Sequence, residues 1–413
     1  MTTPVSRPPT LAAESADATT IRLASIALVV GGFGIGVTEF VTMGLLPQIA
    51  RGIGVDIPTA GHTISAYALG VVLGAPLLSI LGAKAPRRAM LLGLMSAFAV
   101  GNALAAMAPN YETLMLARFV SGVPHGAFFG MASLVAVSLA PTGRSGRAVG
   151  RIMLGIPLAN IVGVPAVTWL GQLYGWRTAY WVVAGVGVLT VVLVRRWVPR
   201  TDADPEQNWH RELQAFRSAQ VWLTIGVGAV GFGGMFAMYS YIAPTVTEVT
   251  GRPESWVPVF LLAFGLGSIV GTWLGGVLAD WSVLRSLAIN GAIMTLLLLA
   301  FSVTAQWTVP AMLTVFAVSV VTGAWVIGLQ MRLMSVAGAA RNLGAAMNHA
   351  SLNFANATGA FLGGSVIAAG YGYRAPSVVG AALALGGLLL LACSVAVHRR
   401  DTALELGAVD PAQ

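Results

Sequence analysis

Three ionisable residues stand in stretches of sequence that are otherwise apolar. Glu39 lies in GVTEFVTMGLLP (36–47), and Arg118 and His125 lie in LARFVSGVPHG (116–126). A carboxylate, a guanidinium and an imidazole can together take up, hold and release a proton. An ionisable group within a membrane costs at least about 2–3 kcal/mol unless it faces a cavity or a partner, so its presence there indicates function. We interpret Glu39, Arg118 and His125 as candidate proton-coupling residues.

The same three residues also have a structural interpretation. Glu39 and Arg118 could form a permanent ion pair, or the Glu39 carboxylate could bond to backbone and fix helix packing. His125 could be a packing residue. The sequence leaves these alternatives open.

These residues must be positioned by membrane helices. The chain has 413 residues, of which 56% are hydrophobic and 9% charged. About 20 apolar residues cross the roughly 30 Å hydrocarbon core of a bilayer. We therefore predict an all-α membrane protein with twelve transmembrane helices, at 22–46, 58–82, 89–108, 112–139, 149–171, 178–198, 219–243, 257–279, 285–305, 309–331, 342–369 and 376–398.

The net charge of +8 could suggest a nucleic-acid partner, but the positions of the basic residues argue against it. If the N-terminus is cytoplasmic, most of the 23 Lys and Arg residues fall in the tails and in the cytoplasmic loops. The opposite side would hold only Arg51, Arg177, Arg252 and Arg374. This excess is the positive-inside pattern, which predicts that both termini lie in the cytoplasm. We expect a lipid bilayer, and no nucleic acid, as the partner.

Several other kinds of chemistry lack the residues that they need. Cys393 is the single cysteine, so no intramolecular disulfide can form. No cluster has metal-ligand spacing, and no glycine-rich phosphate loop with its lysine is present. The GGFGIG run at 31–36 falls inside a membrane segment, where a dinucleotide-binding turn cannot form. We expect no metal, no cofactor and no enzymatic activity, and the missing nucleotide site argues against an ATP-driven pump.

The chain shows an internal repeat. LGAKAPRR (81–88) and LADWSVLR (278–285) are 197 residues apart, as are YGWR (174–177) and YGYR (371–374). Parallel halves with a binding site between them are an architecture of secondary transporters. We predict a mobile cytoplasmic tail at 1–20, a six-helix half at 21–198, a cytoplasmic linker at 199–218, a six-helix half at 219–398 and a cytoplasmic tail at 399–413.

Several motifs resemble those of the major facilitator superfamily. GGVLADWSVLR (275–285) resembles its motif A, with Asp280 and Arg285, whereas SILGAKAPRR (79–88) keeps Lys84, Arg87 and Arg88 but has Ala83 where the aspartate would stand. LARFVSGVPHG resembles motif B, whose arginine is Arg118. The resemblance implies gating roles for Lys84, Arg87, Arg88, Asp280 and Arg285.

Three further segments narrow the resemblance: EFVTMGLLPQIA (39–50), YALGVVLGAP (67–76) and ANIVGVPAVTWLGQLYGWR (159–177). Together they are similar to the drug:proton antiporter branch that contains sugar efflux permeases and chloramphenicol-resistance exporters. In the third segment Val167 stands where this branch usually has glycine. The resemblance implies export coupled to inward proton flow, in the bacterial inner membrane.

The predicted topology places Glu39 and Arg118 at one level, about 9 Å below the outer surface, at 1.5 Å of rise per residue.

Amphipathic substrates need apolar walls with a few polar anchors. We predict that nine residues bind substrate: Phe33, Phe129, Asn160, Phe232, Met235, Tyr239, Trp325, Asn353 and Asn356. Their alternative roles are packing and helix–helix hydrogen bonding.

We therefore predict a monomeric exporter of small organic molecules, drugs or sugars, in exchange for protons. An uncoupled facilitator or uptake permease is the alternative, in which Glu39 binds substrate or only packs. A membrane sensor is a third class, disfavoured because the sequence offers no domain to transmit a signal.

Overall fold

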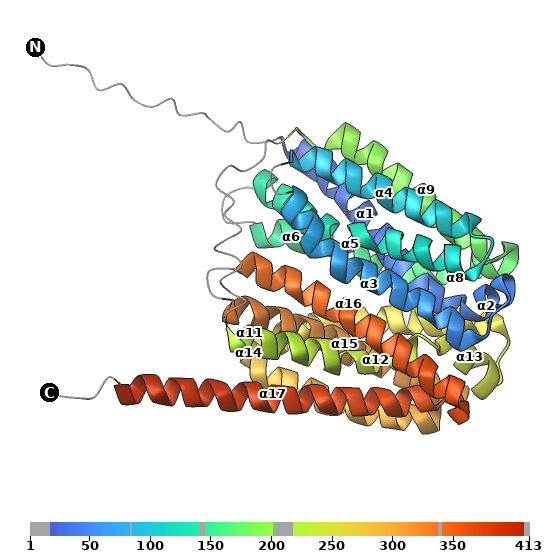
Figure 1. Cartoon of the computed structure of the whole chain (residues 1–413). Helices are drawn as coiled ribbons and strands as arrows, with labels where there is room; N and C mark the ends of the chain where they lie inside the picture. Colours follow the sequence, from blue (N-terminus) through green and yellow to red (C-terminus); the bar gives the residue numbers. More distant parts are fainter. Residues whose placement is uncertain (1–16, 83–84, 141–144, 201–217, 338–340, 409–413) are drawn as a thin grey trace, which may run out of the picture.

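The computed structural model describes residues 17–82, 85–140, 145–200, 218–337 and 341–408, and its regular elements in these ranges are helices. The helices form two layers (Figure 1). The first layer contains α1 (Ala18–Gly44), α2 (Leu46–Ile53), α3 (Ile57–Gly82), α4 (Arg87–Met107), α5 (Tyr111–Leu139), α6 (Ser145–Met153), α7 (Gly155–Leu158), the π-helical turn η1 (Ala159–Gly163), α8 (Val164–Tyr174) and α9 (Trp176–Trp197).

The second layer contains the remaining elements. They are α11 (Ala219–Gly226), η3 (Val227–Gly231), α12 (Gly233–Tyr239), α13 (Ile242–Pro244), η4 (Thr245–Val249), η5 (Glu254–Trp256), α14 (Val257–Thr304), α15 (Thr308–Val336), α16 (Arg341–Val366), η6 (Ile367–Tyr371) and α17 (Ala375–Ala408). α17 runs past the predicted span end at 398, and no proline or glycine stands between that position and Gly407.

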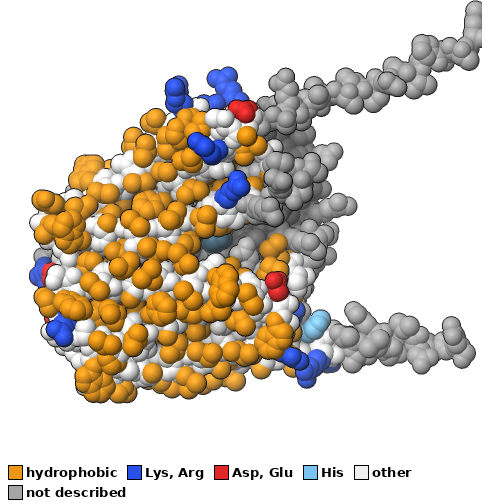
Figure 2. Space-filling view, turned by 180° about the vertical axis from the view of Figure 1, so that it is seen from behind, with side chains coloured by type: hydrophobic (Ala, Val, Ile, Leu, Met, Phe, Trp, Pro, Cys, Tyr) orange, Lys and Arg blue, Asp and Glu red, His pale blue; other side chains and the backbone are white. Residues whose placement is uncertain are grey.

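The chain is an all-α membrane protein. Ten helical segments among the described residues are long and apolar enough to cross a bilayer. One of them, Glu254–Thr304, covers two predicted spans, because α14 continues past a break at Ser282, where φ is −173° and ψ is 111°. Figure 2 shows apolar side chains over the wall of the bundle and charged side chains mainly near its ends.

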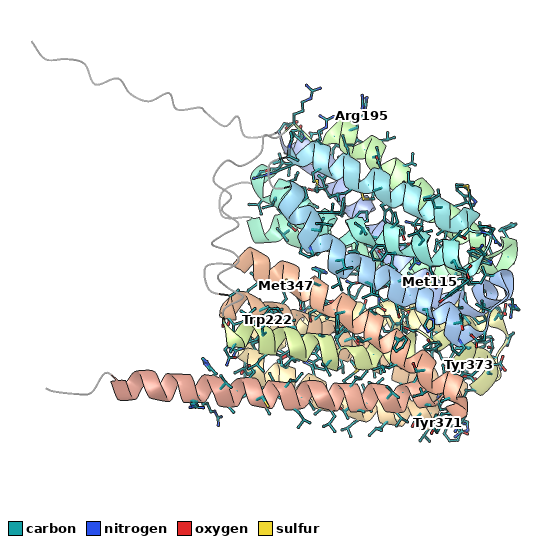
Figure 3. The ribbon with its side chains drawn as sticks, viewed as in Figure 1. Met115, Arg195, Trp222, Met347, Tyr371 and Tyr373 are labelled. Carbon is teal, nitrogen blue, oxygen red and sulfur yellow. The ribbon has the colours of Figure 1, made fainter. Side chains whose placement is uncertain are left out.

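The two ends of the bundle differ in the residues that they carry. α1 begins and α17 ends at the same end (Figure 1). Figure 3 places Arg195, Trp222 and Met347 at this end, and Tyr371 and Tyr373 at the opposite one. Most of the predicted tails and linker lies outside the described residues, as does Lys84.

α1 packs on both layers. Val37 and Val41 belong to an apolar core built only from first-layer residues. Phe40 and Met43, on another face of α1, belong to a core built mainly from the second layer. Because the helix touches both cores, a side chain on α1 between these faces lies at the boundary of the layers.

A cluster of polar contacts joins the two layers at the end away from the start of α1. Glu254 of η5 forms an ion pair with Arg51 of α2, with Oε1 and Nη2 2.7 Å apart. Gln48 Nε2 donates to Glu254 Oε2 at 2.8 Å, and Gln172 Nε2 donates to the Glu254 carbonyl oxygen at 2.9 Å. One second-layer residue is therefore bonded to three first-layer side chains.

α3 and α5 cross closely because glycines remove side chains at the crossing. A Cβ added at Gly122 of α5 would overlap the carbonyl oxygen of Tyr67 on α3, and one added at Gly70 would overlap the carbonyl oxygen of Phe119. Small residues allow this approach of helix backbones in a membrane. The crossing positions Tyr67 beside α5.

We predict that Gly122→Ala destabilises the protein by about 1–3 kcal/mol, because the added methyl group pushes α3 away from α5. Gly130→Ala in the same helix is the matched control, since a Cβ there meets no atom within 4 Å. Thermal unfolding in detergent measures both variants. Equal unfolding temperatures for the two would show that the crossing tolerates a side chain.

Candidate functional site

Arg118 is fully buried in α5 and is bonded to Thr38 of α1. Its Nη1 donates to the Thr38 hydroxyl at 3.0 Å, and its Nη2 donates to the Thr38 carbonyl oxygen at 3.2 Å. The Thr38 hydroxyl donates in turn to Asn102 Oδ1 of α4 at 2.6 Å. These bonds place the guanidinium beside the α1 backbone, one residue from Glu39.

Two tyrosine rings flank the same guanidinium. The Arg118 Cζ atom lies 4.4 Å from the centre of the Tyr67 ring and 5.4 Å from that of Tyr180 on α9. The Tyr180 hydroxyl is bonded to the Thr42 hydroxyl of α1 at 2.8 Å. Cation–π attraction strengthens when the cation is removed from water, so both rings stabilise the buried charge.

Glu39 is 6% exposed and interacts electrostatically with Arg118. The fixed ion pair considered from sequence is not formed: no nitrogen–oxygen contact within 4.0 Å joins these two described side chains. The reason is that the guanidinium donors are directed at Thr38. The Glu39 carboxylate therefore lies close to a positive charge without being tied to it.

A line of rings leads from Arg118 towards the second layer. The Tyr67 hydroxyl is bonded to His125 Nδ1 at 3.0 Å. The His125 ring centre lies 5.5 Å from that of Phe129. The Phe129 ring stacks on His349 of α16, with centres 5.7 Å apart and planes 2° apart. The face of α5 that carries Arg118, His125 and Phe129 is thus buried at the boundary of the layers.

Asn353 and Asn356 of α16 bring amide groups to this boundary. Asn353 Nδ2 donates to the His349 carbonyl oxygen at 3.0 Å, while its Oδ1 is buried without a partner. Asn356 interacts with Glu39, but both polar atoms of its amide lack a bond of hydrogen-bond geometry. Buried polar groups normally have a partner, so these amides are suited to bind water or a polar ligand.

Four of the predicted substrate-binding residues gather in the second layer. Phe232, Met235, Tyr239 and Trp325 belong to one apolar core, which also contains Phe40 of α1. Phe232 and Trp325 have ring centres 6.2 Å apart, and the buried Trp325 Nε1 has no partner. We call this cluster the aromatic wall; its Tyr239 ring contacts Phe40 of α1, with ring centres 6.1 Å apart.

The other predicted residues lie elsewhere. Phe33 and Phe129 pack in the first-layer core, and a Cβ added at Gly163 would overlap the Phe33 ring. Asn160 lies in η1, where its carbonyl oxygen closely approaches Gly265 of α14. These residues are therefore near the boundary of the layers but outside the aromatic wall.

The predicted gating residues do not form ion pairs with one another in the described part of the chain. Arg87 donates to the Leu134 carbonyl oxygen at 3.3 Å, and Arg88 donates to the carbonyl oxygen of Arg195. Asp280 and Arg285 are exposed on either side of the break in α14, and Arg285 lies 5.6 Å from the Trp281 ring centre. Lys84 lies outside the described residues.

Sequence reasoning missed the direct partners of Arg118. Tyr67 begins a segment that carries the family resemblance and Thr38 stands directly before another, but Asn102 and Tyr180 have no motif that marks them. Among the described residues, no group of three or more His, Cys, Asp or Glu is placed to hold a metal ion.

Comparisons with known proteins give the family of the chain. Residues 28–347 match the model of the Major Facilitator Superfamily. The inner membrane transport protein YdhP of Escherichia coli K12 is 42% identical over 89% of this chain and 94% of its own length. The chloramphenicol resistance protein of Streptomyces lividans is 31% identical over 80% of this chain and 86% of its own length.

A solved structure supports the fold. The crystal structure of the nucleoside transporter NupG superposes with a TM-score of 0.74, covering 91% of this chain and 99% of that one, at 13% identity. At this identity the likeness establishes the fold alone. Together with the helices described above, the family match confirms the resemblance found in the sequence, and this chain is a membrane transporter of the Major Facilitator Superfamily.

Proposed function

We propose that this protein exports small organic molecules, drugs or sugars, across the bacterial inner membrane in exchange for protons. The observation that carries the proposal is the buried Glu39 carboxylate, which lies near Arg118 without forming an ion pair with it. A carboxylate in such a place is free to gain and lose a proton. A permanently paired carboxylate would hold its charge.

Two relatives support export as the direction of transport and the bacterial inner membrane as its location. One is a chloramphenicol resistance protein and another is an inner membrane transport protein. The aromatic wall around Trp325 and the amides of Asn353 and Asn356 supply the apolar surface and polar anchors that a small organic substrate requires.

The proposed topology has twelve membrane spans in two six-helix halves, 21–198 and 219–398. The linker and both tails are then cytoplasmic. In this topology the break at Ser282 separates the two spans of α14. α16 is the remaining span; it is not among the ten apolar segments because its polar residues lower its mean hydropathy. The first and last helices meet the same end of the bundle, the end that carries Arg195 (Figure 3).

The proposed mechanism is alternating access by a monomer. The halves rock about the boundary that contains Glu39, so this residue faces the outside and the cytoplasm in turn. Arg118 stays with α1 through its bonds to Thr38. Protonation of Glu39 from outside and release to the cytoplasm would then be linked to export of the substrate.

Glu39→Gln should abolish pH-driven export while leaving the folded protein in the membrane, because an amide cannot exchange the coupling proton. Downhill exchange of substrate should persist, since the amide resembles the protonated acid. Glu39→Asp should couple partly. A panel of radiolabelled drugs and sugars in proteoliposomes with an imposed pH gradient measures transport, and Glu112→Gln, at an exposed position, is the control. Full accumulation by Glu39→Gln would favour the uncoupled facilitator.

Arg118→Ala should lower pH-driven accumulation by about tenfold or more, because charge-assisted hydrogen bonds contribute about 1.5–3 kcal/mol each. Arg118→Lys should recover only part of it, since an ammonium lacks the fork that reaches both Thr38 oxygens. The same proteoliposome assay tests the variants. Arg177→Ala, which removes a partly exposed arginine bonded to the Ala108 carbonyl oxygen, is the control. Wild-type accumulation by Arg118→Ala would remove the arginine from coupling.

Cysteine at Ala85 should react with a membrane-impermeant thiol reagent in inside-out vesicles only, if the loop before α4 is cytoplasmic. Cysteine at Glu112, at the opposite end of the bundle, should react from outside. Both substitutions are made in a Cys393→Ser background so that each protein has one thiol. Labelling of the Ala85 position on intact cells would reverse the topology.

A further inference from the structure

We propose that Tyr67 is a positioning residue that holds Arg118 and His125 as one unit, so that proton exchange at Glu39 is linked to His125. This inference rests on the proposed proton coupling. It adds a residue of α3 to a set that the sequence had confined to α1 and α5.

Tyr67 touches both ionisable residues of α5 at once. Its ring lies 4.4 Å below the Arg118 Cζ atom, and its hydroxyl is bonded to His125 Nδ1 at 3.0 Å. Arg118 and His125 are seven residues apart, which corresponds to about 10 Å along a helix. One side chain therefore spans two turns of α5.

The hydroxyl also controls the state of the imidazole. A neutral histidine has one N–H and one acceptor nitrogen, and the bond at one nitrogen decides which tautomer is present. When the Tyr67 hydroxyl donates to Nδ1, the proton of His125 must be on Nε2. The bond also fixes the ring against rotation, so Nε2 keeps one direction relative to Phe129 and His349.

Three ionisable groups act electrostatically on Tyr67 or His125. Glu39 of α1 and Arg118 of α5 act electrostatically on Tyr67, and His349 of α16 acts on His125. Among the described residues, Tyr67 contacts both Arg118 and His125. A change of charge at Glu39 is thus sensed by the residue that orients His125.

Tyr180 provides a matched control. It is also fully buried, its ring also lies beside Arg118, and its hydroxyl also makes one hydrogen bond, to Thr42. Tyr67→Phe and Tyr180→Phe each remove one buried hydroxyl and keep the ring against the guanidinium. They differ in whether a histidine loses its partner.

The first measurement follows His125 directly and needs no substrate. Protein with ¹⁵N-labelled histidine is placed in nanodiscs, and the His125 signals are assigned by their loss in His125→Gln. We expect wild type to show the Nε2-protonated tautomer with a hydrogen-bonded Nδ1, and Tyr67→Phe to lose that signature. Tyr180→Phe should keep it. Unchanged His125 signals in Tyr67→Phe would overturn the proposal.

The second measurement tests the consequence for coupling, with radiolabelled chloramphenicol as the probe. Tyr67→Phe should lower the ratio of pH-driven accumulation to downhill exchange about tenfold, as expected for a lost bond of about 1.4 kcal/mol. Tyr180→Phe should lower both rates in proportion and leave the ratio unchanged. A wild-type ratio in Tyr67→Phe refutes the positioning role.

The two measurements separate this inference from the proposed function. If wild type shows no pH-driven accumulation of chloramphenicol but Tyr67→Phe loses the His125 signature, coupling of this probe fails and the positioning of His125 holds. If wild type accumulates the probe and Tyr67→Phe matches it in both assays, coupling holds and the positioning role fails.

Discussion

The burial of one guanidinium in apolar surroundings is the constraint on which the first layer depends. An isolated ion in such a place would cost many kcal/mol, so it must be bonded and covered. Arg118 of α5 is bonded to Thr38 of α1, which is itself bonded to Asn102 of α4, and it is covered by Tyr67 of α3 and Tyr180 of α9. Five helices are thereby fixed around one charge. Because Glu39 follows Thr38 directly in α1, the bonds of Thr38 also fix the position of Glu39.

The position of α1 between two cores gives this site its link to the second layer. Phe40 and Met43 follow Glu39 closely along the chain and pack among second-layer residues. Asn356 approaches Glu39 from α16, and Phe129 stacks on His349 of the same helix. Movement between the layers must therefore change the surroundings of Glu39, whereas the bonds of Arg118 stay within the first layer.

Hydropathy was sufficient to predict an all-helical membrane protein, because the length of an apolar run is set by bilayer thickness. Counting residues from the ends of the predicted helices was sufficient to predict that Glu39 and Arg118 lie at the same depth in the membrane. The partners of Arg118 could not be predicted, because they depend on how each helix is rotated. Tyr180 on α9 looks no different in sequence from an interfacial tyrosine. Likewise, the break at Ser282 and the π-helical turn at Asn160 are local backbone events without a hydropathic signal.

The contacts of Glu254 have a kinetic consequence. Its ion pair with Arg51 is solvent-exposed, with side chains 38% and 64% accessible, and such a pair contributes only about 0–1 kcal/mol. The two glutamine bonds add little more, since each competes with water. Separating the layers at this end therefore breaks a small number of weak bonds together. Salt weakens the ion pair further, so these polar bonds add little to the barrier to opening; the apolar packing of Leu46 and Ala50 against the second layer must also be broken.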